Sequence, residues 1–249
     1  MQNWDGKIKY ITKTGQFKIG LLPSVYKRCI ELGIKPIIVD MRQPLPKVSK
    51  VVTQIGKYKL RPEQEKAVKA ILSNKLGETP FQIGVLDYTV NAGKTLIMSA
   101  LYLSYKKQLK TLLITNDSDW LNQARDEFKQ YLPGEDITFV QGKVLNWSNF
   151  TIGMVQSISR NMKYYQNELA KIDMVLIDEA DQGGSKQYQN VITRLFNTRV
   201  RIGLSGTIYM SKLAKDKVKN MNLRCFFGDV IAEFKLKDSI KKGIQQRPL

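Results

Sequence analysis

Short apolar segments alternate with helical segments from residue 59 onward, and this alternation is the strongest constraint on the fold. The segments predicted as strands are residues 81–86, 111–115, 150–155, 173–177 and 199–204. The segments predicted as helices are residues 93–105 and 119–131, after a first helix that opens at Arg61-Pro62. Strands that alternate with helices form parallel sheets with helices on both faces, because each helix returns the chain to the edge where the next strand begins. We therefore predict one α/β domain over residues 53–249.

Residues 1–52 follow a different pattern and are predicted to form a small α/β domain with a linker. The expected elements are a hairpin over residues 7–19, a helix over 23–32, a strand over 34–39 and a linker over 41–52. Gly33 is expected to end the helix. A segment of this size is too small for a generous core of its own.

Positive charge gathers at the two ends of the chain. There are 40 Lys and Arg residues against 22 Asp and Glu residues, a net charge of +18. Residues 1–52 hold ten basic and three acidic residues, and residues 211–249 hold ten and four. Such basic surfaces attract polyanions, and nucleic acid is the commonest polyanion in a cell. Solubility or anionic lipid is the alternative explanation for the charge.

Composition also excludes several kinds of site. The chain has no histidine, so histidine triads, His-x-x-x-His zinc sites and histidine bases are excluded. Its two cysteines, Cys29 and Cys225, are expected to be reduced thiols. No apolar segment is long enough to cross a bilayer, and the N-terminus lacks the pattern of a signal peptide. We expect a soluble cytoplasmic protein with no membrane partner.

A phosphate-binding loop is predicted where residues 88–95 read Tyr-Thr-Val-Asn-Ala-Gly-Lys-Thr, between a strand and a long helix. Backbone N–H groups at a helix N-terminus bind phosphate, Lys94 would reach the β- and γ-phosphates, and the Thr95 hydroxyl would bind Mg²⁺. Gly93 lets the backbone approach the phosphate. The residues assigned to ATP binding here are Val90, Asn91, Ala92, Gly93, Lys94 and Thr95.

The loop departs from the strict pattern at two positions. Tyr88 stands where the pattern has glycine, and Asn91 stands where many such loops carry a second glycine. Asparagine tolerates left-handed dihedral angles better than other non-glycine residues, so the loop is still expected to close.

An acidic cluster follows the apolar strand that ends at Ile177. Asp178-Glu179-Ala180-Asp181 would lie at the carboxyl end of a buried parallel strand, where open α/β sheets bind ligands. We predict that Asp178 holds Mg²⁺ and that Glu179 orients and deprotonates the attacking water. The three predicted catalytic residues are thus Lys94, Asp178 and Glu179. A solvated acidic loop is the alternative, and the phosphate loop upstream argues against it.

With these two motifs in order, the chain resembles the first motor domain of superfamily-two helicases, especially the phage UvsW-like and bacterial restriction-motor types. The resemblance covers residues 57–234 and implies a RecA-like P-loop NTPase fold. Residues 59–64 resemble the adenine-recognising segment, in which Gln64 would read the adenine edge with Arg61 nearby. The residues that the resemblance places against nucleic acid are Asn116, Ser118, Gln156, Ser157 and Arg160. Those that would couple hydrolysis to domain movement are Asp181, Ser205 and Thr207.

Two positions depart from these families, and the chain also differs from the DEAD-box helicases. Asp181 replaces the histidine usual in UvsW-like members, and Val155 replaces a threonine before Gln156. The tetrapeptide at 178–181 spells Asp-Glu-Ala-Asp, but the chain lacks the other motifs of the DEAD-box RNA helicases, which have Ser-Ala-Thr where this chain has Ser-Gly-Thr at 205–207.

The resemblance implies an ATP-dependent DNA helicase or translocase that acts on branched or duplex DNA in recombination, replication or repair. An RNA helicase is the first alternative, and a nucleotide-gated nucleic-acid-binding switch without efficient hydrolysis is the second. The first 52 residues would contact DNA or pack as a cap on the motor. No Gln-x-x-Gly-Arg-x-x-Arg segment is present, so we expect a second RecA-like domain in the full-length protein and weak hydrolysis by this chain alone. The chain would be a truncated fragment or a natural half-motor.

Overall fold

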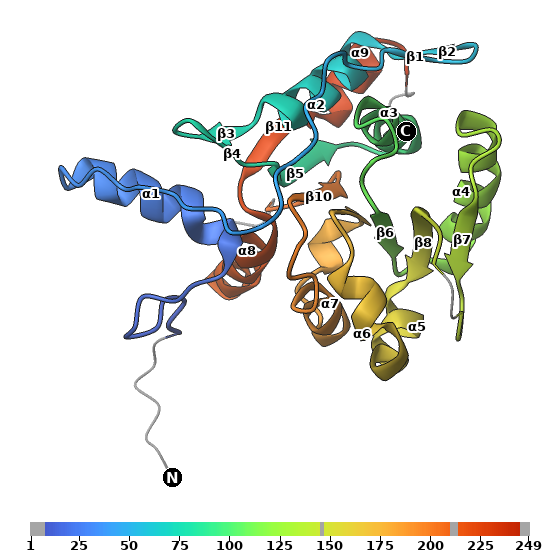
Figure 1. The fold of residues 1–249 in the computed structure, drawn as a ribbon. Coiled ribbons are helices and arrows are strands. Elements are labelled where there is room, and N and C mark those ends of the chain that lie inside the picture. The colour runs from blue at the N-terminus through green and yellow to red at the C-terminus, as the bar shows by residue number, and fades with distance from the viewer. Residues whose placement is uncertain (1–7, 145–146, 210–213, 245–249) are drawn as a thin grey trace.

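The central strands are buried at nearly every position because both faces of the sheet are covered. In the computed structural model, which describes residues 8–144, 147–209 and 214–244, seven parallel strands lie in the order β11-β5-β10-β9-β6-β8-β7 (Figure 1). Their bounds are β5 (Ile83–Tyr88), β6 (Thr111–Thr115), β7 (Ile137–Val140), β8 (Phe150–Met154), β9 (Met174–Asp178), β10 (Val200–Ser205) and β11 (Val230–Phe234). The parallel α/β fold predicted for this part of the chain is confirmed.

Helices cover both faces of the sheet. The bounds are α2 (Pro62–Ser73), α3 (Lys94–Ser104), α4 (Ser118–Tyr131), α5 (Val155–Arg160), α6 (Met162–Ala170), α7 (Lys186–Ile192), α8 (Ala214–Phe227) and α9 (Leu236–Lys241). Helices α2, α3 and α4 share one buried cluster with Leu176 of β9, whereas α5 to α8 share another with Val175 and Ile177. Successive β9 side chains therefore enter opposite cores, as a strand buried on both faces requires.

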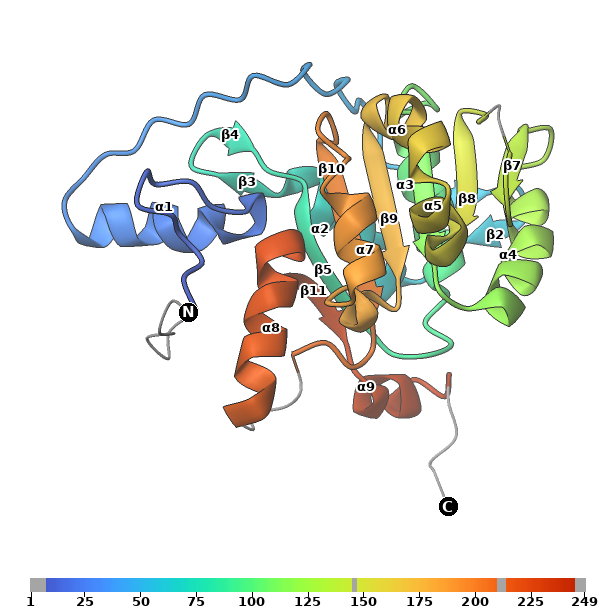
Figure 2. The same ribbon diagram turned by 90° about the horizontal axis from the view of Figure 1, so that it is seen from below.

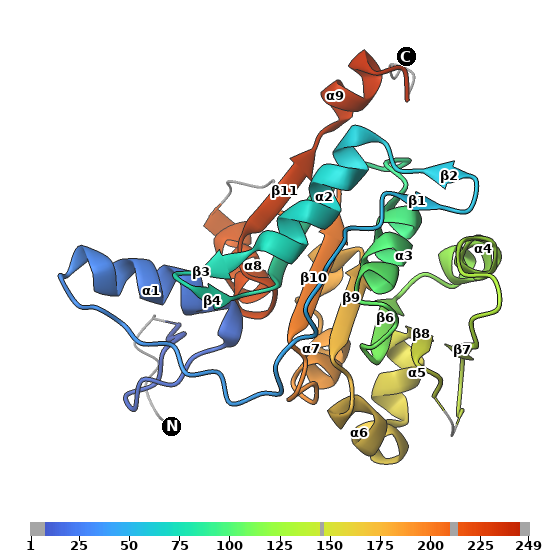
Figure 3. The same ribbon diagram turned by 45° about the horizontal axis from the view of Figure 1, so that its top comes forward.

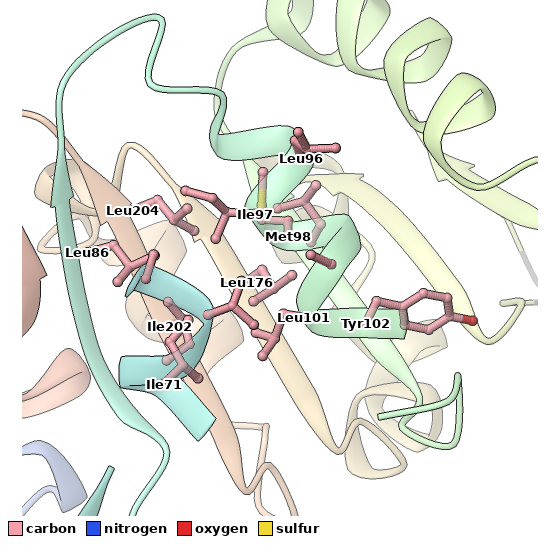
Figure 4. Close-up of a cluster of buried hydrophobic side chains, with 14 of the residues drawn as sticks. Ile71, Leu86, Leu96, Ile97, Met98, Leu101, Tyr102, Leu176, Ile202 and Leu204 are labelled. Atoms are coloured by element: carbon pink, nitrogen blue, oxygen red, sulfur yellow. The ribbon is translucent and has the colours of Figure 1, made fainter. Parts of the chain in front are cut away.

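The core on the α2 and α3 face lies directly behind the phosphate loop. Figure 4 shows Ile97 and Leu101 of α3 beside Leu176, Ile202 and Leu204 of the two central strands. All five side chains are at most 1% exposed. Burial on this scale contributes roughly 1.5–3 kcal/mol for each large aliphatic side chain. The helix that carries the loop lysine in its first turn is thus packed against a fully buried core.

The remaining elements of the fold are short hairpins, two 3₁₀ turns and the N-terminal helix. Two small antiparallel hairpins pair β1 (Gln54–Ile55) with β2 (Tyr58–Lys59) and β3 (Lys75–Leu76) with β4 (Thr79–Pro80). The 3₁₀ turns are η1 (Ile19–Leu21) and η2 (Ala180–Gln182), and α1 spans Leu22–Glu31. No helix in the described part of the chain has the length and apolar character needed to span a membrane.

The N-terminal segment contains the predicted helix but not the predicted third strand. Helix α1 projects from the sheet (Figure 1), and Gly33 follows it with a φ of 74°. The expected hairpin is reduced to one antiparallel bridge between Ile11 and Phe17. Residues 34–39 run without strand pairing, and Ile37 is 86% exposed. The strand prediction there was wrong because no sheet edge lies alongside the segment and Pro36 removes a backbone donor.

The segment of residues 34–52, which we call the strap, crosses from α1 to β1 as an extended chain (Figure 2). It is attached to the start of β10 by ion pairs. Asp40 accepts hydrogen bonds from Arg42 and lies 3.3 Å from the Arg199 Nε. Arg42 donates to the Thr198 carbonyl, and Arg199 donates to the Gln43 carbonyl at 2.6 Å. The linker predicted at 41–52 is therefore a fixed connection, while the domain boundary after residue 52 stays a prediction.

A second contact joins the N-terminal segment to α8. Gly20 of η1 is buried against that helix, and a Cβ at this position would lie 2.0 Å from the Arg224 carbonyl oxygen. Only glycine allows the two backbones to approach so closely. The N-terminal segment is thus packed on the α/β domain at two places, namely α8 and the start of β10.

Candidate nucleotide site

The predicted phosphate loop lies at the carboxyl end of β5, where the chain turns into α3. Asn91 has a φ of 61° and Gly93 a φ of 73°, so two of the loop residues are left-handed. Asn91 therefore has the left-handed backbone conformation that was expected of it. The Thr89 N–H donates to the Phe234 carbonyl of β11 at 3.1 Å. This bond holds the first residue of the loop on the neighbouring strand.

Helix α2 fixes the other end of the loop. The Gln64 side-chain amide donates to the Ala92 carbonyl at 2.9 Å, and its oxygen accepts from the Arg61 backbone N–H at 2.9 Å. The Arg61 guanidinium donates to the same Ala92 carbonyl at 2.7 Å. Gln64 is 2% exposed, so its amide is fully used within the protein. Its direct contacts are with the phosphate loop, and a role in reading adenine stays a prediction.

Tyr88 replaces the first glycine of the loop pattern for a packing reason. Its ring is fully buried and lies 6.0 Å from the ring of Phe234, centroid to centroid. Its hydroxyl donates to the Glu63 carbonyl in the first turn of α2 at 2.8 Å. Tyr88 therefore joins β5, β11 and α2 immediately before the loop begins.

Gly93 is required for two separate reasons, which gives a testable prediction. Alanine in a left-handed conformation is strained by roughly 1–2 kcal/mol. A Cβ at Gly93 would also lie 2.3 Å from the Gln64 Nε2, breaking a buried hydrogen bond that contributes about 1 kcal/mol. We expect Gly93→Ala to lower the free energy of unfolding by about 2–3 kcal/mol in urea titrations without nucleotide.

The matched control is Gly134→Ala, which has a φ of 78° and nothing within 4 Å of its Cβ. It should show the dihedral strain alone. Equal losses in the two variants would contradict the contact between Gly93 and Gln64.

Lys94 and Asp178 meet across the sheet although 84 positions separate them in the sequence (178 against 94). The Lys94 Nζ lies 3.5 Å from the Asp178 Oδ1, and both side chains are largely buried, at 17% and 4% exposed. Burial raises the pKa of Asp178 above its ordinary value, and the nearby Lys94 charge offsets part of that rise. The predicted convergence of loop lysine and acidic strand end is present.

The residues at this point suit a magnesium ion bound together with phosphate. Apart from the Lys94 ammonium 3.5 Å away, the buried Asp178 Oδ1 has no hydrogen-bond donor, so this carboxylate oxygen could also bind a cation. Thr95 starts α3 beside Lys94 and is 7% exposed. No cluster of three or more His, Cys, Asp or Glu side chains capable of holding a metal occurs among the residues that the structure covers. Mg²⁺ uses one or two protein ligands together with substrate phosphates, and Thr95 and Asp178 would be those ligands.

Glu179 follows Asp178 in the chain and is more exposed to solvent than Asp178. Its side chain is exposed, and its backbone has a φ of 50°, which is rare for a non-glycine residue. Burial of part of the group raises its pKa above the ordinary value, and the charges of Asp178, Asp181 and Asp117 raise it further. A carboxylate with a raised pKa at a solvent-facing position is suited to accept a proton from water.

The residues predicted to couple hydrolysis to domain movement also lie together. The Ser205 hydroxyl donates to the Asp181 carboxylate at 2.8 Å, and the Thr207 N–H donates to the Ser205 hydroxyl at 3.2 Å. Asp181 at the end of β9 is thereby joined to the loop after β10. An aspartate fills the position that the resemblance gives to histidine and still makes the link.

Several of these groups line one cleft of about 230 Å³, whose residues are Thr89, Val90, Lys94, Glu179, Asp181, Gln182, Ser205, Gly206 and Thr207. A larger cavity of about 530 Å³ lies under the strap, beside α2, and no acidic side chain lines it. The cleft is therefore the candidate site. Val90 lies in the loop, and 65% of the residue is exposed.

The residues predicted to contact nucleic acid fall on two neighbouring strand ends. The Gln156 side chain after β8 donates to the Asn116 carbonyl after β6 at 3.3 Å. Ser118 at the start of α4 and Arg160 at the end of α5 are exposed, whereas the Ser157 hydroxyl accepts from the Gly142 N–H at 3.0 Å. The structure thus brings the two segments together, and contact with nucleic acid stays a prediction.

Sequence reasoning missed four charged residues around the loop. Glu63 and Asp87 are 5% and 3% exposed, and they pair with Lys242 and Lys235 respectively. Glu63 lies in the segment 59–64, which was already predicted to be near the nucleotide. That position was the one feature of the sequence that could have indicated a role for Glu63. The lysines lie in a basic segment that had no motif.

Comparison with known proteins agrees with this geometry. The sequence pattern of a protein family described as the type III restriction enzyme, res subunit, matches residues 57–210. A mimivirus (Acanthamoeba polyphaga mimivirus) protein named as an ATP-dependent RNA helicase is 26% identical over 147 residues, which are 59% of this chain and 27% of that protein. The ATP-dependent DNA helicase uvsW of Enterobacteria phage T4 is 24% identical over 227 residues, which are 83% and 43%. The chain thus spans less than half of either relative.

Solved structures show the same fold. The crystal structure of the UvsW helicase from bacteriophage T4 superposes with a TM-score of 0.70 at 22% identity, covering 92% of this chain and 84% of that one. The SWI2/SNF2 ATPase core of Sulfolobus solfataricus, solved with double-stranded DNA, gives 0.54 at 20% identity, covering 73% and 38%. The chain therefore belongs to the family of the type III restriction enzyme res subunit, and it contains the first RecA-like domain of a superfamily-two helicase.

Proposed function

We propose that this chain is the ATP-binding part of an ATP-dependent DNA helicase or translocase that acts on branched or duplex DNA. The observation that carries the proposal is the buried pair of Lys94 and Asp178, with Glu179 beside it at the mouth of the cleft. A phosphate loop, a metal-binding carboxylate and a solvent-facing carboxylate together are the parts that nucleoside triphosphate hydrolysis requires.

In the proposed mechanism, Lys94 and the backbone N–H groups of the loop bind the β- and γ-phosphates. Thr95 and Asp178 would hold Mg²⁺, which neutralises charge on the phosphate oxygens. Glu179 orients the water and accepts its proton as the water attacks the γ-phosphorus. The bond to the leaving oxygen of ADP then breaks, and inorganic phosphate forms. Through their hydrogen bond, Asp181 and Ser205 would transmit the loss of the γ-phosphate to the loop after β10.

A second motor domain is part of the proposal. Among the described residues that line the cleft, Lys94 is the one cation, whereas an added arginine accelerates phosphoryl transfer by roughly 10³–10⁵ in rate. We therefore propose that the complete protein supplies arginines from a second RecA-like domain. This chain alone would bind ATP and hydrolyse it weakly.

DNA is the proposed nucleic acid. The similarity to the T4 DNA helicase extends over 83% of this chain, whereas the similarity to the mimivirus RNA helicase covers 59%. The surface near the predicted nucleic-acid residues is basic and aromatic, since the Lys143 Nζ lies 3.8 Å from the centroid of the exposed Tyr164 ring. Exposed aromatic rings beside cations are suited to unpaired bases. The N-terminal segment would add its basic charge to this surface or pack solely as a cap.

The test is the ATPase rate of the complete protein with forked DNA, duplex DNA, single-stranded DNA and duplex RNA at one salt concentration. We expect forked or duplex DNA to stimulate hydrolysis at least about tenfold more than RNA, because a motor couples turnover to its own track. Preferential stimulation by RNA would favour the RNA helicase. Nucleotide binding without turnover on any of the four would favour the nucleotide-gated switch.

A further inference from the structure

Two buried carboxylates flank the phosphate loop without a part in the proposed hydrolysis. Asp87 lies on β5 just before the loop, and Glu63 lies in the first turn of α2, which holds the far side of the loop. They are 3% and 5% exposed. A buried carboxylate is costly unless cations and hydrogen-bond donors surround it. The source of those cations therefore matters for the nucleotide site.

Both cations come from the segment of residues 235–242, which includes α9. Lys235 pairs with Asp87, and the Lys242 Nζ lies 2.7 Å from the Glu63 Oε2. Figure 3 shows α9 after β11, at the end of the sheet where α2 begins. Phe234, immediately before this segment, accepts the hydrogen bond from Thr89. Phe234 and two residues of the segment, Lys235 and Lys242, thus support the loop and its flanking elements from three points.

A direct path leads from Lys242 to the loop. Glu63 binds Lys242 through one carboxylate oxygen and the Arg61 Nε, at 2.7 Å, through the other. The Arg61 Nη2 in turn donates to the Ala92 carbonyl at 2.7 Å and contacts the Asn91 carbonyl at 3.5 Å. Burial alone would raise the pKa of Glu63, but the hydrogen bonds from Lys242 and Arg61 hold it below its ordinary value.

We infer that Lys242 is a positioning residue of the nucleotide site, which fixes Glu63 and, through Arg61, the shape of the phosphate loop. Nucleotide affinity then depends on the docking of the segment 235–242 through its ion pairs with Glu63 and Asp87. The dependence is reciprocal, because a docked segment that strengthens nucleotide binding is itself stabilised when nucleotide is bound. This inference rests on the proposed function, since it takes the loop to bind a nucleotide.

The experiment measures the affinity of the 249-residue chain for a fluorescent, non-hydrolysable ATP analogue with Mg²⁺ by anisotropy. We expect Lys242→Met to weaken binding about fivefold, the effect of losing one half-exposed charge-assisted contact to a buried carboxylate. Lys242→Arg keeps the charge and should retain binding within about twofold. Lys241→Met, at the exposed last residue of α9 next to Lys242, should bind like the wild type. All variants are first checked for cooperative thermal unfolding without nucleotide.

A double-mutant cycle separates positioning through Glu63 from a direct effect of the lysine charge on the nucleotide. In the Glu63→Gln background, Lys242→Met should cause no further loss. A fivefold loss that persists there would overturn the inference, as would unchanged binding by Lys242→Met alone. If the wild-type chain does not bind the analogue, the proposed function itself fails, and with it the inference.

Discussion

Replacing Lys94 with alanine is expected to abolish the rise in unfolding temperature that ATP and Mg²⁺ give to the wild-type chain. The Lys94 Nζ lies 3.5 Å from Asp178, at the point where the phosphates would bind. Its removal takes away the positive charge that binds them and leaves a 4%-exposed carboxylate without its partner. Ligand at about 100 times its Kd stabilises a protein by about 2.7 kcal/mol, and we expect this stabilisation to be lost.

Thermal unfolding over a series of ATP·Mg²⁺ concentrations measures the effect. Lys129→Ala, at an exposed position on α4, is the control and should keep the full shift. An equal shift in Lys94→Ala would show that the nucleotide binds elsewhere and would remove the basis of the site assignment. The unfolding temperature without ligand is measured alongside, so that loss of binding is not confused with loss of folding.

Replacing Glu179 with glutamine is expected to separate binding from turnover in the complete protein. Glutamine has nearly the same size and leaves Lys94, Thr95 and Asp178 in place, so the nucleotide should bind as before. It cannot accept a proton from water, and a general base contributes about 10²–10⁴ in rate. We expect DNA-stimulated hydrolysis to fall by at least about 100-fold.

The measurements are steady-state ATPase with duplex DNA and a parallel nucleotide titration. Glu78→Gln provides a matched change at a side chain that is 96% exposed, and it should leave turnover intact. Undiminished turnover in Glu179→Gln would exclude this residue as the base. Loss of nucleotide binding in parallel would instead indicate a structural role at its left-handed backbone position.

The sequence predicted the central strands well because they are buried on both faces. The segment 111–115 matches β6 at both ends, and α4 begins one residue before its prediction. The edge strands β7 and β11 were missed, since an edge strand is partly exposed and mixes polar with apolar residues, as Glu233 does in β11. The predicted strand at 34–39 failed for a related reason. Its apolar pattern suits a strand, but strand formation needs a neighbouring edge that sequence alone does not supply.

The site was predictable where topology dictates proximity. Lys94 and Asp178 follow strands of one parallel sheet, and the carboxyl ends of such strands share an edge. The contact of Gln64 with the Ala92 carbonyl was not predictable, because it depends on the tilt of α2 over the loop. The pair of Lys242 and Glu63 is separated by 179 positions and belongs to no motif. Side-chain pairs of this kind depend on packing that local patterns do not encode.

The attachment of the strap to β10 has a mechanical consequence. Asp40 and Arg42 hold the strap at the residues where β10 begins, and the same strand ends at Ser205 in the cleft. β10 lies between β5 and β9 and is hydrogen-bonded to both, so it is stiff along its length. The strap and the Asp181–Ser205 link are therefore attached to opposite ends of the same six-residue strand.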